Sequence, residues 1–115
     1  MSTKEEFQNY LLSYLDKKWN WYCLSANPNI TLDFILKHYH LDWNWNYVIR
    51  NPSITLYHIE DHPEIPWDML HFSWNPNLTF KYIEEHPEIK WDFYFFISKN
   101  KFNCYFEDKP LYILK

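Results

Sequence analysis

Apolar residues recur in pairs along the chain, and each pair encloses a residue that typically begins a helix. In the first pattern, Ile30 precedes Thr31 and Ile35 follows four positions later. This arrangement is a hydrophobic staple, in which Thr caps the first turn while the two apolar residues contact each other across it. The same pattern recurs around Thr55 and Thr79. We therefore predict helix starts directly after Thr31, Thr55 and Thr79.

A second staple begins with Trp and has Asn or Asp, the strongest N-cap residues, at the cap. Its four copies begin at Trp19, Trp43, Trp67 and Trp91. Prolines end both kinds of helix, because a proline disfavours helical geometry in the residue before it. The first pattern predicts helices over about 32–38, 56–62 and 80–86, and the second predicts helices over about 45–50, 69–74 and 93–98.

The two staples alternate within a repeat of 24 residues. The same period separates the Asn-Pro segments at Asn27, Asn51 and Asn75 and the histidines His38, His62 and His86. Helices of about seven residues are shorter than the ~12–15 that a helix needs for independent stability, so they must pack on their neighbours. We predict an all-α fold in which short helix-turn-helix repeats stack as a small α-solenoid.

A β-solenoid of the leucine-rich-repeat kind has a period of similar length, and Ile-Thr-Leu at 30–32 alternates like a short strand. The leucine ladder of that class is missing here, however, and helix caps have no role in a strand. The helical interpretation accounts for more of the pattern.

We expect residues 1–115 to form one repeat domain with a cap at each end. Ser2-Thr3 followed by Glu5-Glu6 is typical of a capping box, so 1–18 is predicted to be an N-terminal cap containing a longer helix from about 4 to 17. The repeats fill 19–103. The segment 104–115, with its apolar residues 110–114, is either a C-terminal cap or an exposed tail.

Composition and charge argue against several classes of protein. The net charge of -4 leaves no basic surface for a nucleic acid. No apolar run approaches the ~18 residues of a membrane span, and the acidic N-terminus does not resemble a signal peptide. Cys23 and Cys104 fit no metal or redox spacing and are typical of a reducing compartment. We expect an intracellular protein that is not secreted and has no membrane partner.

No residue pattern predicts an enzyme or a cofactor. The chain contains no Gly for a phosphate-binding loop, and no Ser or Cys lies in a catalytic motif. His38, His62 and His86 would lie in successive layers about 8–10 Å apart, whereas zinc needs ligands at about 2 Å from one centre. A His at a helix end instead suits the negative end of the helix dipole. We expect no catalytic residue, no metal and no cofactor.

The Asn and Trp series raise the hypothesis of a base-reading repeat. Asn27, Asn51 and Asn75 each precede Pro, however, where Asn readily closes an Asx-turn. Trp side chains in a staple are expected to lie in the core, where they cannot stack on bases. The acidic charge also disfavours a polyanion. A nucleic-acid partner is therefore the weakest of the binding hypotheses.

Acidic residues cluster where the first helix of a repeat turns into the second. One cluster recurs one period later, so together they would form an acidic edge that comprises Glu60, Asp61, Glu64, Glu84, Glu85 and Glu88. Two interpretations remain open. The edge either serves solubility, or it is a docking strip for a basic partner.

The combined motifs resemble a known group of repeats. Asn-Pro-Asn-Ile-Thr at 27–31, Trp-Asn-Trp at 43–45 and His-Pro-Glu-Ile-Pro at 62–66 are similar to the short tandem repeats of giant viruses of amoebae, of the mimivirus and marseillevirus kind. The resemblance covers about residues 19–103. It implies a viral origin, a repeat fold and a location in the host cytoplasm or nucleus, or in the virion. The chain departs from the pattern at Met69 and Phe93, which replace the second Trp.

These observations favour a non-enzymatic module that binds a viral or host protein. Its specificity would come from positions that the repeat leaves variable, namely Asp33, Tyr57, Lys81, Asn46, Leu70 and Tyr94. The alternative is a structural virion component that self-associates through its C-terminal end.

Overall fold

The chain is all-α over the part that its computed structural model describes, residues 2–100, with side chains through residue 96. No strand occurs within that range. The helices, of which η1 is a 3-10 helix, are α1 Thr3–Ser13, α2 Trp21–Ser25, α3 Leu32–Lys37, α4 Trp45–Val48, α5 Leu56–Asp61, η1 Met69–Trp74, α6 Phe80–Glu85 and α7 Phe93–Asn100. The predicted C-terminal segment 104–115 lies outside the described residues.

Helices α3, α5 and α6 begin where the Thr staples predict. The Thr31 hydroxyl accepts a hydrogen bond from the amide of Phe34 at 3.2 Å, and Thr79 accepts one from Tyr82 at 3.1 Å. At Thr55 the backbone amide also donates to Nδ1 of His58 at 3.1 Å. The three helices end one residue earlier than predicted, because His38, His62 and His86 are C-caps with non-helical backbone angles.

The second set of helices begins at the predicted Asn and Asp caps. Asn20, Asn44 and Asp92 accept from the amide three residues onward at 3.1, 3.1 and 3.0 Å. Asp68 instead accepts from the amide of Leu70, two residues onward, at 3.1 Å. The helix that follows Asp68 is η1, so this tighter cap accompanies 3-10 rather than α geometry.

A buried serine on the preceding helix of the same set anchors two of these starts, that of α4 to α2 and that of α7 to η1. The Ser25 hydroxyl accepts from the amide of Asn44 at 2.9 Å, and that of Ser73 accepts from Asp92 at 2.8 Å, each across 19 residues. Ile49 occupies the equivalent position between them and offers no hydroxyl to Asp68. The 3-10 helix η1 thus lacks this anchor, whereas α4 and α7, which have it, are α-helices.

The N-terminal helix is shorter than predicted. Its capping box is present, since the amide of Glu5 donates to Ser2 Oγ at 3.2 Å and the amide of Ser2 donates to the Glu5 carboxylate at 3.3 Å. The helix ends at Ser13 rather than near residue 17. Tyr14 leaves helical geometry, and its carbonyl accepts bonds from the Lys17 amide and the Trp19 indole. The turn therefore brings Trp19 to the start of α2.

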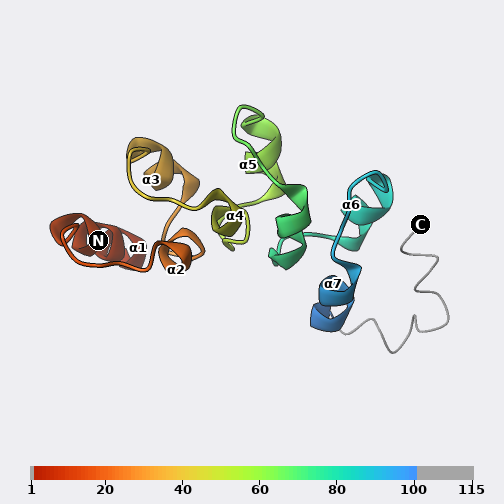
Figure 1. The fold of residues 1–115 in the computed structure, drawn as a ribbon, viewed down its shortest axis with the longest axis horizontal. Coiled ribbons are helices and arrows are strands. Elements are labelled where there is room, and N and C mark those ends of the chain that lie inside the picture. The colour runs from red at the N-terminus through yellow and green to blue at the C-terminus, as the bar shows by residue number, and fades with distance from the viewer. Residues whose placement is uncertain (1, 101–115) are drawn as a thin grey trace.

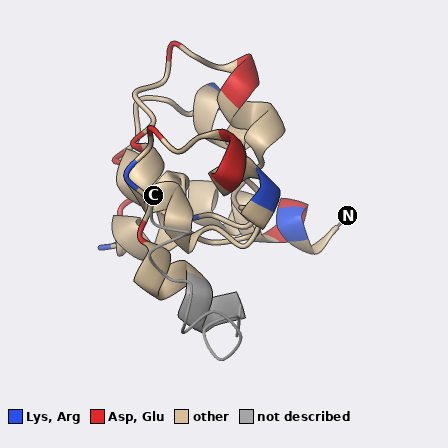
Figure 2. Cartoon of the chain, turned by 90° about the vertical axis from the view of Figure 1, so that its right-hand side faces the viewer, with Lys and Arg blue, Asp and Glu red and all other residues tan. Residues whose placement is uncertain are grey.

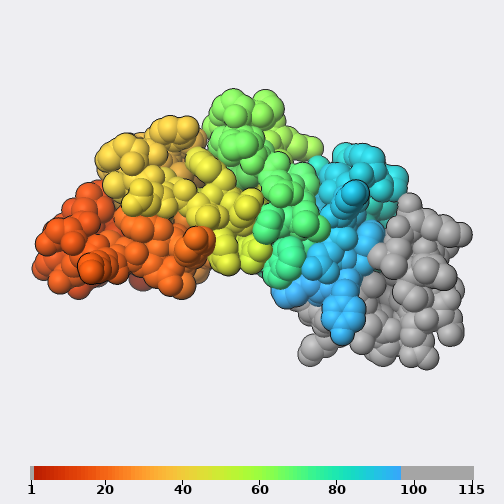
Figure 3. Space-filling model, in the orientation of Figure 1, coloured from red at the N-terminus to blue at the C-terminus, as the bar shows by residue number. Residues whose placement is uncertain are grey.

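The helices alternate between two rows along the long axis of the molecule. Figure 1 shows α3, α5 and α6 as an upper row and α2, α4, η1 and α7 as a lower row, with α1 at the N-terminal end. The extents are 52 × 29 × 25 Å. Successive segments of the chain adjoin one another along this axis (Figure 3). The core includes the fully buried Ile30, Ile35, Val48, Ile54 and Phe72.

Candidate functional site

Two asparagines of the Asn-Pro segments, Asn51 and Asn75, are buried and are 0% and 1% exposed, whereas Asn27 is partly exposed. The Nδ2 group of Asn51 donates to the carbonyls of Ser25, Asn27 and Ile30 at 2.9, 2.8 and 2.9 Å. Asn75 repeats this set one period later, with the carbonyls of Ile49, Asn51 and Ile54 at 2.8, 2.9 and 3.0 Å. Each amide shares its two protons among three backbone carbonyls of the preceding segment. The Asn side chains therefore join segments that are 24 residues apart.

The side-chain oxygens of the same residues close the predicted Asx-turns. They accept from the amides of Asn29, Ser53 and Asn77 at 2.8, 2.8 and 2.7 Å. In Asn51 and Asn75 both ends of the buried amide are thus engaged by the backbone. Neither side chain is free to contact a base.

Each tryptophan of the second staple caps the helix that precedes it. The indole N–H donates to the carbonyl five residues earlier, in the pairs Trp19–Tyr14, Trp43–His38, Trp67–His62 and Trp91–His86, at 2.8, 2.9, 2.9 and 3.1 Å. These carbonyls lie at helix ends and each also accepts one backbone amide, from Lys17, Leu41, Ile65 or Ile89, so the indole supplies a second hydrogen bond. The fixed spacing between His and Trp was visible in the sequence, but its role as a C-terminal cap was not predicted.

The six residues of the acidic edge all lie on the surface. Two belong to the last turn of α5, two to the last turn of α6, and Glu64 and Glu88 to the loops that follow. Figure 2 shows acidic segments on these helix ends. Lys37 and His40 occupy the equivalent positions one period before Asp61 and Glu64. The edge is therefore confined to the corners after α5 and α6.

Carboxylates of both acidic clusters raise the pKa of the same group, the Tyr82 hydroxyl. Partial burial raises the pKa of Tyr82, and the charges of Glu60, Glu88 and Glu85 raise it further. Glu60 lies on α5, whereas Glu85 and Glu88 belong to α6 and its loop. The negative potentials of the two corners therefore overlap at Tyr82.

Within each corner a histidine pairs with the loop glutamate. Nδ1 of His62 lies 2.9 Å from Oε2 of Glu64, and Nδ1 of His86 lies 3.1 Å from Oε2 of Glu88. The bond from His62 is the main cause that lowers the pKa of Glu64. The pKa of Glu88 is lowered mainly by its own backbone N–H and then by His86.

We expect the substitution His62→Ala to raise the pKa of Glu64 toward its ordinary value of 4.5. A carboxyl whose pKa is lowered by folding adds stability above its ordinary pKa, and this contribution is lost as the pH falls through the lowered value. The two proteins should therefore differ in stability above about pH 4.5 and converge in more acidic solution. An NMR titration of the Glu64 side chain checks this. The control is His38→Ala, because the residue two positions after His38 is His40 and not a glutamate. If Glu64 titrates in His62→Ala as it does in the wild type, His62 does not lower its pKa.

A second cluster, not predicted from the sequence, is centred on Arg50 in the lower row. Its members, the Arg50 cluster, are Tyr47, Arg50, Asp68, His71 and Trp74. Cζ of Arg50 lies 4.6 Å from the ring centroid of Tyr47 and 4.5 Å from that of Trp74. The guanidinium is thus held between two aromatic faces, a favourable position for a cation.

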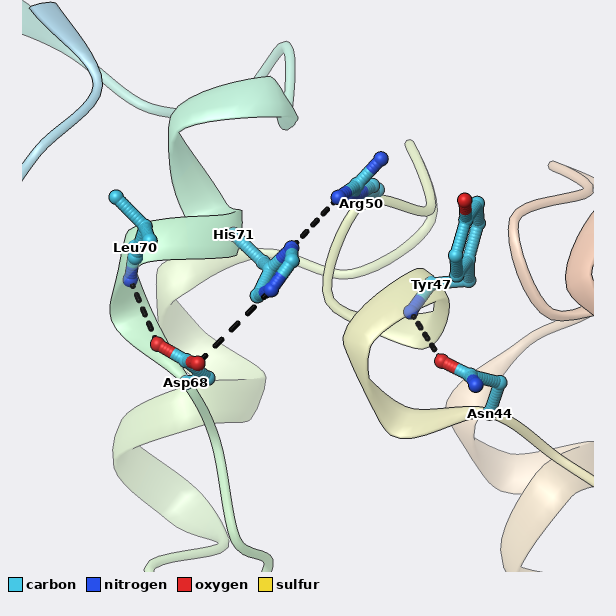
Figure 4. A network of polar contacts seen from close by, with 6 residues as sticks. All are labelled: Asn44, Tyr47, Arg50, Asp68, Leu70 and His71. Carbon is cyan, nitrogen blue, oxygen red and sulfur yellow. Dashed lines mark hydrogen bonds and ion pairs between the residues drawn. The ribbon is translucent and has the colours of Figure 1, made fainter.

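Histidine and aspartate extend the cluster along η1 (Figure 4). Nη2 of Arg50 lies 2.6 Å from Nδ1 of His71, and Nε2 of His71 lies 3.9 Å from Oδ2 of Asp68. Because an arginine always carries its protons, Nδ1 of His71 is the acceptor. The proton of the neutral ring therefore sits on Nε2, which faces Asp68.

Aromatic rings continue on both sides of the cluster. Tyr22 lies 5.1 Å from Tyr47, and Phe95 lies 5.1 Å from Trp74, measured between ring centroids. Together with Arg50, these rings form a continuous series that runs across α2, α4, η1 and α7. The only sign of this cluster in the sequence was the single arginine of the chain. The equivalent positions one period before and after Arg50 are Ala26 and Trp74.

Other candidate chemistry does not converge on a site. Among residues 2–100 no group of three or more His, Cys, Asp or Glu side chains could hold a metal ion. None of the helices in this range has the length and apolar character of a membrane span. Cys23 is exposed as a free thiol, and Cys104 lies outside the described part. No protein-family model, curated protein or solved structure matches the chain.

Proposed function

We propose that this chain is a non-enzymatic binding module, built as a small α-solenoid of 24-residue repeats, that engages another protein. Support for the repeat scaffold comes from Asn51 and Asn75, which make the same set of bonds one period apart. The Asn and Trp positions serve the fold. The six variable positions, among them Tyr57, Leu70 and Tyr94, are all exposed and chemically diverse.

The observation that carries this proposal is the position of the acidic edge at the ends of α5 and α6. The C-terminal end of a helix carries partial negative charge, so each carboxylate there opposes the helix dipole. Glu60 and Asp61 occupy the last turn of α5, where α3 has Lys37. Solubility alone would be served equally well by acids elsewhere on the surface. An unfavourable but recurring position is better explained by a basic partner that approaches this edge.

We expect a short oligolysine peptide to bind the acidic edge with an affinity that falls as salt is added. A triple substitution of Glu60, Glu84 and Glu85 by Gln should weaken binding at least tenfold, as measured by isothermal titration calorimetry. The matched control replaces Asp16 and Asp42 by Asn and Glu6 by Gln, which removes the same charge from exposed positions outside the edge and outside the six variable positions. Equal binding by the two triple variants would contradict a specific docking strip.

A self-associating structural component of a virion is the second candidate. The apolar residues 110–114 favour it, because such a segment is suited to contact another copy of the chain. Light scattering over a range of protein concentrations distinguishes the two proposals. A monomer at all concentrations would exclude self-assembly and leave the binding module.

We also propose that the protein originates from a giant virus of amoebae and acts in the host cytoplasm or nucleus, or in the virion. The support is the set of motifs at 27–31, 43–45 and 62–66 described above. Immunofluorescence and fractionation of infected amoebae, with purified virions as a separate sample, would test this location.

A further inference from the structure

We propose that the Arg50 cluster is a second docking site, which receives a carboxylate from an acidic segment of a partner protein. The inference rests on the proposed function as a protein-binding module, and it adds the chemistry of a partner segment. It concerns the lower row of helices, whereas the acidic edge lies at the ends of two upper-row helices.

The charge of Arg50 is not neutralised by any carboxylate of the described part of the chain. No aspartate or glutamate there forms an ion pair with it, and Asp68 reaches only His71, at 3.9 Å. Nε of Arg50 is buried and has no hydrogen-bond partner. A half-buried cation in this state is stabilised by the two rings and one neutral imidazole. A carboxylate from another molecule would form the ion pair that the Arg50 guanidinium lacks among the described residues.

The geometry leaves one side of the guanidinium available. Nη2 is bonded to His71, while the other terminal nitrogen points away from His71 and Asp68 (Figure 4). The stacking rings hold the planar group in one orientation, so little side-chain freedom remains to be lost on binding. Charge-assisted bonds between arginine and carboxylate are among the stronger hydrogen bonds in proteins.

The surroundings offer apolar contact to residues that flank such a carboxylate. Tyr22 is 57% exposed and packs on Tyr47, and Leu70 and Tyr94 on the same row are 40% and 86% exposed. Tyrosine, tryptophan and arginine are the residues that dominate binding energy at protein interfaces. The partner segment is therefore expected to carry an acidic residue next to apolar or aromatic ones.

The fold itself does not require a cation at this position. Ala26 and Trp74, one period before and after Arg50, are uncharged, yet α2 and η1 form beside them. An arginine that only filled space would be replaceable by such residues. Its charge is explained by an interaction that the described residues do not complete.

The test uses the full chain labelled with 15N and two capped peptides, one with glutamates flanking a tyrosine and the other an oligolysine. Because Arg50 is the only arginine, its Nε–H group gives a single NMR signal. We expect the glutamate peptide to shift this signal and that of the Trp74 indole. Arg50→Lys keeps the charge but loses the planar fork, and it should weaken binding at least tenfold. Lys37→Gln, a loss of charge in the upper row, should leave it unchanged.

The outcomes separate this inference from the proposed function. A glutamate peptide that leaves the Arg50 signal unmoved at millimolar concentration overturns the site, as does equal binding to the wild type and Arg50→Lys. Oligolysine binding at the acidic edge would then still support the module. If Arg50→Lys fails to fold, the shift of the Arg50 signal in the wild-type protein decides alone, because the global charge of -4 opposes non-specific binding of an acidic peptide.

Discussion

Replacing Asn51 by Ala is expected to lower the free energy of unfolding by about 3 kcal/mol or more, a large part of the stability of a domain this size. The substitution removes the donor to three backbone carbonyls and the acceptor of the Ser53 amide. Buried polar groups that lose their partner cost about 1–3 kcal/mol each, although some of these carbonyls keep a second bond. Urea unfolding followed by Trp fluorescence measures the change.

Two further variants make the Asn51 experiment specific. Asn46→Ala removes the same side chain from an exposed position of α4 and should change stability by less than about 0.5 kcal/mol. Asn51→Asp keeps the shape but directs a carboxylate at three carbonyls, so its loss should be at least as large at neutral pH and smaller in acid, where the carboxyl can donate. If Asn51→Ala were as stable as Asn46→Ala, the buried Asn would not join the segments.

Replacing Trp43 by Ala is expected to cost about 3–5 kcal/mol, the range for a large side chain removed from a core. Trp43 is 9% exposed, packs against Trp21 and Phe34, and donates to the His38 carbonyl at 2.9 Å. Trp43→Phe keeps most of the apolar area and removes the indole N–H. The loss of this hydrogen bond is expected to cost about 1 kcal/mol. Denaturant unfolding of both variants gives the packing and capping contributions separately.

Trp45→Phe is the matched control for the Trp43 series. Phe93 already occupies the equivalent position two periods later, where it packs against the core. The control should therefore lose less stability than Trp43→Phe. If the two variants were equally stable, the indole cap at His38 would have no measurable role.

Much of the fold was predictable from the sequence because its determinants act over very short distances. An N-cap bond joins residues two or three positions apart, as at Thr31 and Phe34, so a local pattern contains both partners. The Asx-turn at Asn51 is equally local. The Trp caps also span only five residues and could have been found from the constant spacing between His38 and Trp43. The end of α1 was not predicted, because it depends on the turn after Tyr14, in which the Trp19 indole donates to the Tyr14 carbonyl.

The two candidate surfaces also differ in how far the sequence predicted them. The acidic edge was visible because its clusters recur with the period, and the structure adds that Glu60 acts on Tyr82 from a neighbouring helix. The Arg50 cluster was invisible, because it joins Arg50 to Trp74 and His71 across 24 and 21 residues. Nothing in a single repeat predicts that contact.

The sequence by itself determined where the capped helices begin, since caps and staples bring together residues that are already neighbours along the chain, whereas α1 and α4 end earlier than predicted, at Ser13 and Val48. Only the tertiary structure decided which carbonyls the Asn51 amide bonds, that η1 is a 3-10 helix, and that the single arginine lies between two rings. These features depend on the packing of one segment against the next. Apart from Tyr47, the partners in these contacts lie about one period away along the chain, a distance at which the local pattern carries no information about contact.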